Sequence, residues 1–107
     1  MSEYDSDDVK FGAELEVFAL DSFQRREKKL TDESRSFLRL ASISWFTDNP
    51  WRQDGRNSEP QYWLDLGREI VNEVVDDERL GRIVRFPMIV RVVTDVTDRQ
   101  LRNVGFK

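Results

Sequence analysis

The apolar residues of this chain follow a strand-like spacing near its two ends and a helical spacing in its middle. Residues 9–17 alternate between apolar and mostly polar positions, which is the period-two pattern of a half-buried strand. The residues from Ala13 to Leu30 compete with that reading, because they are rich in helix formers and place Asp21 and Arg25 four positions apart. We predict strand character that ends near Val17 and a helix over about 18–29.

Two further helices are predicted in the middle of the chain. Thr31 suits a helix start because the acids Asp32 and Glu33 follow it, and an apolar face then extends to Trp45. This helix, about 32–46, should end before Pro50. The next helix, about 59–80, follows a capping-box pattern and carries a stripe at helical spacing, with Gly81 as the expected cap; the pattern and stripe residues are Ser58, Gln61, Trp63, Leu66, Ile70 and Val74.

The last third of the chain changes to β-branched residues. Residues 83–96 read as a strand in which Ile83 and Arg85 share one face and Pro87 restricts the strand to an edge or a break. Its backbone needs a pairing partner. That partner is residues 9–17 of the same chain or, alternatively, another chain, which makes a homodimer an open alternative. A short helix from Thr97 would close the chain.

These elements predict an α+β fold with three main helices, a small sheet from about 9–17 and 83–96, and a short carboxyl-terminal helix. Residues 1–8 are acidic and lack apolar periodicity, so we expect a disordered tail followed by one globular domain over 9–107. No apolar run approaches the ~20 residues that span a bilayer. The acidic start does not resemble a targeting signal and the chain has no cysteine, so we expect a cytoplasmic protein with no membrane contact.

Composition argues against catalysis. The chain has no histidine and no cysteine, the usual neutral-pH base, thiolate nucleophile and zinc ligands. The five glycines are scattered and form no phosphate-binding loop. We therefore expect no enzyme, no catalytic residues, no metal site and no cofactor.

Charge is segregated along the chain. Residues 1–33, 34–58, 59–81 and 82–107 carry net charges of −5, +2, −5 and +4. Five arginines near the carboxyl end form a candidate nucleic-acid patch: Arg82, Arg85, Arg91, Arg99 and Arg102. An isoelectric point near 4.9 opposes direct nucleic-acid binding, so we expect these arginines to pair with the acidic helix over 59–78 instead.

All three tryptophans lie between positions 45 and 63. Trp45 and Trp63 fit the buried faces of two helices, whereas Trp51 falls in the polar connection between them. Tryptophan and arginine are enriched at binding hot spots, and long connections are often functional. We predict a partner-binding site at Trp51, Arg52, Asp54 and Arg56, with a lid of Trp51 over the core as the alternative.

The expected function is that of a small acidic protein-binding module without catalysis. We expect an inhibitor or accessory factor that covers a surface of a larger protein or ribonucleoprotein complex. Its size and composition are similar to those of phage or mobile-element anti-defence proteins such as anti-CRISPR proteins, which is an analogy and not a residue match. The alternatives are a nucleic-acid-associated regulator that uses the arginines and an oligomerising assembly or virion component.

Overall fold

The computed structural model describes residues 6–48 and 60–103, apart from six side chains within its helices, those of Asp7, Trp45, Thr47, Asp48, Pro60 and Leu101. The described part contains four helices and two short strands, in the order α1 (Ser6–Arg25), β1 (Lys29–Leu30), α2 (Asp32–Asp48), α3 (Pro60–Asp76), β2 (Ile83–Val84) and α4 (Phe86–Asn103). None of these helices is long and apolar enough to cross a membrane.

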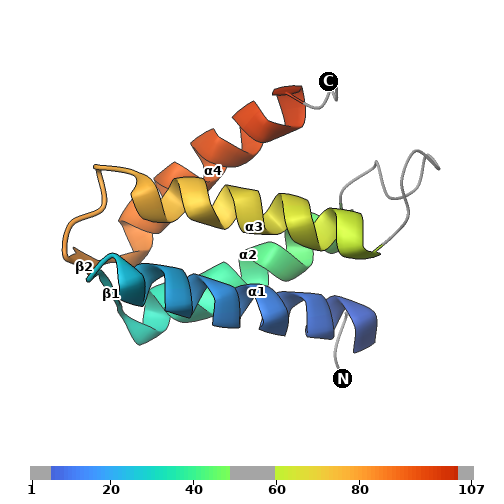
Figure 1. Ribbon diagram of the computed structural model, residues 1–107, viewed down its shortest axis with the longest axis horizontal. Coiled ribbons are helices and arrows are strands. Elements are labelled where there is room, and N and C mark those ends of the chain that lie inside the picture. The colour runs from blue at the N-terminus through green and yellow to red at the C-terminus, as the bar shows by residue number, and fades with distance from the viewer. Residues whose placement is uncertain (1–5, 49–59, 104–107) are drawn as a thin grey trace.

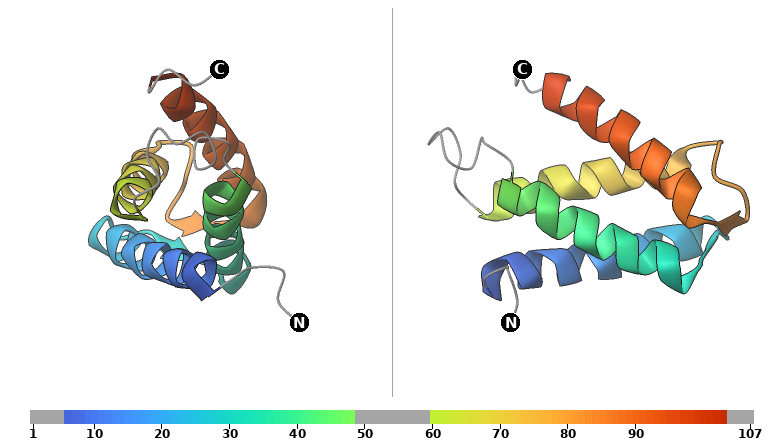
Figure 2. Two further views of the ribbon diagram at one scale, coloured as in Figure 1. Left: turned by 90° about the vertical axis from the view of Figure 1, so that its right-hand side faces the viewer. Right: turned by 180° about the vertical axis from the view of Figure 1, so that it is seen from behind.

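The helices form a bundle that the strands close at one end. Helix α1 packs along both α2 and α3, while α4 contacts α3 and α2 near the strands and diverges from them toward its own carboxyl end (Figures 1 and 2). Strands β1 and β2 pair in parallel, with Lys29 opposite Ile83 and Leu30 opposite Val84. The domain is therefore mostly helical.

Two clusters of buried side chains fill the bundle. The cluster next to the strands includes Phe23, Val75, Val84 and Ile89. The other cluster lies toward the opposite end and is centred on Trp63, which is 0% exposed. The ring of Phe46 packs edge-on against Trp63 and stacks on Phe11. The predicted core role of Trp63 is confirmed, whereas the side chain of Trp45 lies outside the described residues.

The predicted strand over 9–17 is wrong, because these residues belong to α1. Phe11, Leu15 and Ala19 lie four residues apart and face the core. Val9, Ala13 and Val17 are also four residues apart but are shifted by two positions, which places them on a different side of the helix. Two helical stripes offset by two residues produce an apparent period of two. The helix also begins at Ser6, inside the segment expected to be a tail.

The predicted strand over 83–96 is wrong except for Ile83–Val84. Pro87 lies in the first turn of α4, where a missing N–H costs no helical hydrogen bond. Ile89, Val92 and Val96 are then buried at spacings of three and four residues. Burial of this stripe outweighs the strand preference of the β-branched residues. The expected short carboxyl-terminal helix is thus the end of a much longer one.

The two middle helices, α2 and α3, agree more closely with the prediction from the sequence. Thr31 caps α2 as expected, since its Oγ1 accepts a hydrogen bond from the backbone N–H of Ser34 at 3.1 Å. Helix α3 ends at Asp76, so Gly81 is not its cap. Lys28 satisfies that end instead, because its Nζ donates to the backbone oxygens of Val75 at 2.7 Å and Asp77 at 3.2 Å. The Ser58 half of the predicted capping box lies outside the described residues, and Gln61 donates to Asp65.

Candidate contact surfaces

The loop site predicted from the sequence, Trp51, Arg52, Asp54 and Arg56, lies outside the described residues. The second predicted site, the five arginines near the carboxyl end, lies within them.

The fold does not assemble the five arginines into one patch. Arg85 immediately precedes α4 and Arg102 lies in its last turn, so the length of the helix, roughly 25 Å, separates them. Arg99 forms an ion pair with Glu73 of α3. The expected pairing with the acidic helix is therefore confirmed for Arg99 alone. The other four arginines are exposed and form no ion pair within the described part of the chain.

Arg82 and Arg85 lie at the end of the bundle that the strands close. Ile83, between them in sequence, is 56% exposed, whereas its neighbour Val84 is fully buried. The parallel register places Lys29 directly opposite Ile83, and the backbone N–H of Lys29 donates to the carbonyl oxygen of Arg82 at 2.7 Å. These four residues, Lys29, Arg82, Ile83 and Arg85, form what we call the sheet-end surface.

Contacts from three directions hold the sheet-end surface in place. The hydroxyl of Ser34, at the start of α2, donates to the carbonyl oxygen of Val84 at 3.2 Å. Lys28 ties the residue before β1 to the end of α3. Arg26 forms an ion pair with Asp76 across the same end. These hydrogen bonds and this ion pair fix the backbone of both strands. The exposed side chains of the surface therefore start from defined backbone positions.

Arg79 ties the segment between α3 and β2 to α4. Its guanidinium forms ion pairs with Asp77 at 2.9 Å and with Asp95 at 2.8 Å. The side-chain hydrogen bond from Arg79 lowers the pKa of the Asp77 carboxyl, against a smaller opposing effect of burial. The hydrogen bonds that Arg79 donates, first to Asp77 and then to Asp95, raise the pKa of Arg79.

These ion pairs determine which charged side chains at the sheet end have no ion-pair partner among the described residues. Asp76 and Asp77 are engaged by Arg26 and Arg79. Lys29, Arg82 and Arg85 keep unpaired side-chain charges, and so do the acids Glu27 and Glu78, as far as the described residues show. An open hollow of about 710 Å³ adjoins Lys29 and Arg82 and is lined by Leu20, Phe23 and Leu30. This hollow therefore combines the free cations Lys29 and Arg82 and the acid Glu27 with apolar side chains.

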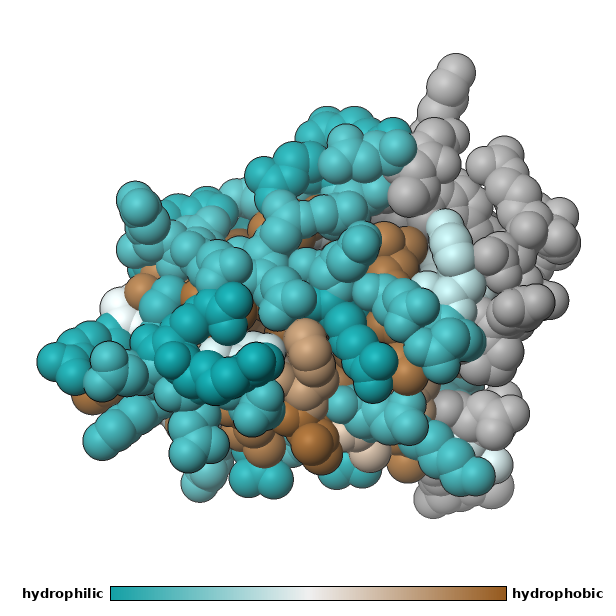
Figure 3. Space-filling view, in the orientation of Figure 1, coloured by the Kyte–Doolittle hydropathy of each residue, from teal (hydrophilic) through white to brown (hydrophobic). Residues whose placement is uncertain are grey.

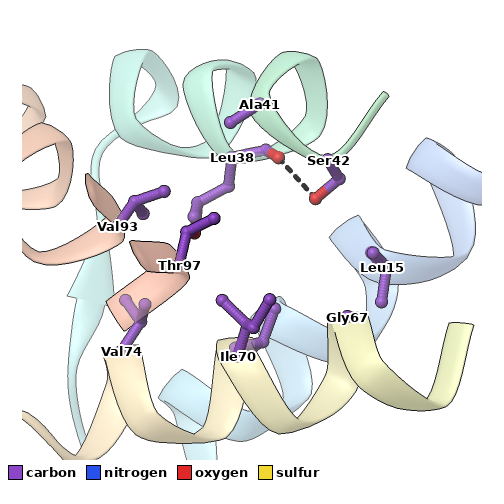
Figure 4. A pocket seen from close by; sticks show the side chains of 10 residues that line it. Leu15, Leu38, Ala41, Ser42, Gly67, Ile70, Val74, Val93 and Thr97 are labelled. Atoms are coloured by element: carbon purple, nitrogen blue, oxygen red, sulfur yellow. Dashed lines mark hydrogen bonds between the residues drawn. The ribbon is translucent and has the colours of Figure 1, made fainter. Parts of the chain in front are cut away.

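A second candidate is the apolar cavity where α4 diverges from the bundle. Figure 4 shows Leu38, Ala41 and Ser42 of α2 facing Gly67, Ile70 and Val74 of α3, with Val93 and Thr97 of α4 at one side. The Ser42 hydroxyl donates to the carbonyl oxygen of Leu38 at 2.8 Å and is thus already satisfied. The cavity volume of about 40 Å³ holds a water or two but not an organic ligand.

The surface of the face formed by α1 and α3 is mostly hydrophilic, with hydrophobic atoms between and below the charged side chains (Figure 3). Among the described residues, no three side chains of Asp, Glu, His or Cys converge to hold a metal ion.

The chain matches no family model, no curated protein and no solved structure to which it was compared.

Three of the four residues of the sheet-end surface, Arg82, Ile83 and Arg85, were identified from the sequence. The alternation of Ile83 and Arg85 predicted that both point to one side, and Arg82 and Arg85 belonged to the predicted arginine patch. Lys29 was missed, because its position opposite Ile83 depends on pairing between strands that α2 and α3 separate in the chain. No local signal in the sequence points to that contact.

Proposed function

We propose that this chain is a non-catalytic protein-binding module that acts by covering a surface of a larger protein or ribonucleoprotein partner. The observation that supports the proposal is the sheet-end surface. There, the exposed Ile83 lies opposite Lys29 in the strand pair and between Arg82 and Arg85 in the sequence, and these three cationic side chains form no ion pair within the described part of the chain. Exposed apolar side chains with neighbouring arginines are typical of binding hot spots.

The chemistry of this surface suggests the partner's surface. A guanidinium binds a carboxylate through two parallel hydrogen bonds, and Ile83 needs an apolar pocket to leave water. We infer a partner surface in which carboxylates surround a small hydrophobic depression. An inhibitor needs no more than this, since occupation of such a surface excludes other ligands of the partner.

Nucleic acid is the second class of partner, and Arg82 and Arg85 are the residues that would favour it. A phosphate backbone has no apolar surface that Ile83 could contact. The chain as a whole also carries a net charge of −4, which opposes binding to a polyanion. Fluorescence anisotropy with labelled duplex and single-stranded DNA and RNA at physiological salt should show no submicromolar binding. Submicromolar binding that weakens steeply with added salt would contradict the protein-binding proposal.

The direct test places a photo-crosslinking amino acid at Ile83 in cells that produce the protein. We expect one dominant crosslinked partner, and we expect Arg85→Glu in the same chain to lower its yield at least about tenfold. Arg102→Glu is the matched control, because Arg102 is equally unpaired but lies at the far end of α4. Equal loss with both variants would indicate a general charge effect and would refute a contact at the sheet end.

A further inference from the structure

Helix α1 has a second apolar face that the core does not use. Val9, Ala13, Val17 and Leu20 follow one another at spacings of four, four and three residues, which aligns them along one side of the helix. Val17 is 66% exposed, and the other three are half-buried. We call these four residues the outer stripe. The residues that α1 buries, such as Leu15 and Ala19, lie on the opposite side.

Part of the outer stripe, Ala13 and Val17, borders an open hollow that Glu14 and Asp21 also line. Ala13, Val17 and Phe18 line this hollow together with Arg68 of α3, and its volume is about 590 Å³. The guanidinium of Arg68 lies 5.7 Å from the centre of the Phe18 ring and forms its far wall. In the lower part of Figure 3, where α1 lies, hydrophobic residues are visible between hydrophilic ones. An apolar face at helical spacing is the usual seat of a second helix.

Charged residues beside the outer stripe indicate which helix would pack against it. Lys10 and Asp21 lie on the same flank of the stripe, one near each end of it. Lys10 forms no ion pair within the described residues. Among the described residues, Asp21 pairs with Arg25 alone, at 3.1 Å, and both side chains are more than half exposed, so this pair is weak and easily exchanged.

We propose that the outer stripe is the contact between two copies of this chain, which pack α1 against α1 in antiparallel orientation about a two-fold axis. In such a pair each flank runs along the same flank of the other copy in the reverse direction. With the axis at the middle of the stripe, Lys10 lies within about half a helical turn of Asp21 of the second copy. The arrangement thus forms two identical ion pairs.

The same geometry also brings like charges together. Glu14 lies near the middle of the stripe on the flank that carries Lys10 and Asp21, so it approaches Glu14 of the second copy. The stripe is also short, since Val9 to Leu20 spans about 17 Å along the helix. A contact of that length falls short of the ~800 Å² per partner of a stable interface. The pair is therefore a weak dimer in exchange with the monomer.

Sedimentation velocity from micromolar to millimolar protein tests the proposal. The weight-average mass should rise above the 12.7 kDa of the single chain as the concentration increases. Val17→Glu should lower the association constant at least about tenfold, because it places a charge in the middle of the stripe. Val90→Glu is the matched control, since Val90 is 37% exposed on α4 and should leave association unchanged. Circular dichroism confirms that both variants fold.

Charge exchange tests the antiparallel orientation. Lys10→Glu and Asp21→Lys should each weaken association, and the double variant should restore it at low salt. Glu14→Gln should strengthen it. A monomer at every concentration, or a dimer that Val17→Glu leaves intact, would overturn the proposal. Loss of association that the double variant does not restore would overturn the antiparallel pairing. Because Ile83 and Arg85 are untouched, these outcomes do not depend on the proposed function.

Discussion

Gly12 allows α1 and α2 to approach closely. A Cβ atom built at this position would collide with Cγ1 of Ile43 and would lie 2.7 Å from its Cδ1 and 3.3 Å from the backbone oxygen of Arg39. Ile43 is 4% exposed and has little room to move. Real Cβ atoms are almost never found closer than 3.0 Å to such neighbours. The absence of a side chain at Gly12 is therefore a packing requirement.

Gly12→Ala should lower the free energy of unfolding by up to about 2 kcal/mol. Alanine gains about 1 kcal/mol in helix propensity, but overpacking a fixed contact costs about 1–3 kcal/mol, and we expect the collision to dominate. Gly81→Ala is the control, because a Cβ there has no neighbour within 4 Å. Urea unfolding of both variants measures the difference. A Gly12→Ala protein as stable as the wild type would show that Ile43 of α2 moves to make room for the added methyl group.

At the scale of elements, Arg79 connects the segment between α3 and β2 to α4. Three hydrogen bonds from Arg79 reach the carboxylate of Asp77, at 2.8, 3.0 and 2.9 Å, and a fourth reaches Asp95. Because the hydrogen bond from Arg79 lowers the pKa of Asp77, the folded state favours the ionised carboxylate more than the unfolded state does. That stabilisation is present above the ordinary pKa of 3.8 and is lost as the pH falls through the lower folded value.

Asp77→Asn should therefore be less stable than the wild type at neutral pH, and the difference should shrink as the pH falls below 3.8. Asp98→Asn is the control, because Asp98 is an exposed acid without an ion pair among the described residues. Urea titrations at a series of pH values provide the measurement. A stability difference for Asp77→Asn that does not change with pH would rule out the pairing with Arg79 as its cause.

At the scale of the whole molecule, α1 and α3 join the two core clusters. Phe11 and Leu15 of α1 belong to the cluster around Trp63, whereas Ala19 and Phe23 belong to the cluster next to the strands. Helix α3 likewise contributes Trp63 and Leu66 to one cluster and Val74 and Val75 to the other. A helix that crosses both clusters cannot lose one without weakening the other. We therefore expect a single cooperative unfolding transition.

Trp63→Ala should lower the free energy of unfolding by about 3–5 kcal/mol while the transition stays cooperative. Leu40→Ala, at a position that is 55% exposed, should cost far less and serves as the control. Far-ultraviolet and near-ultraviolet circular dichroism should report coincident transitions for both variants. Two separate transitions in Trp63→Ala would mean that the clusters unfold independently.

The sequence by itself determined the elements whose signals are local. The start of α2 follows from Thr31 and the acids after it, and α3 follows from a single apolar stripe around Trp63. The contact between Asp21 and Arg25 follows from their spacing. Each of these features depends on residues within one or two helical turns, so the chain carries the information without its fold.

Only the tertiary structure decided the two ends of the chain and the candidate surfaces. The period-two pattern over 9–17 resolves into two helical stripes once Phe11 and Leu15 are seen to face the core and Val17 is seen to face outward. The β-branched residues after Pro87 become helical because Ile89, Val92 and Val96 bury one face against the bundle. Lys29 meets Ile83 because α2 and α3 return the chain to β1. In each case the deciding energy comes from contacts between residues far apart in sequence, which no local pattern contains.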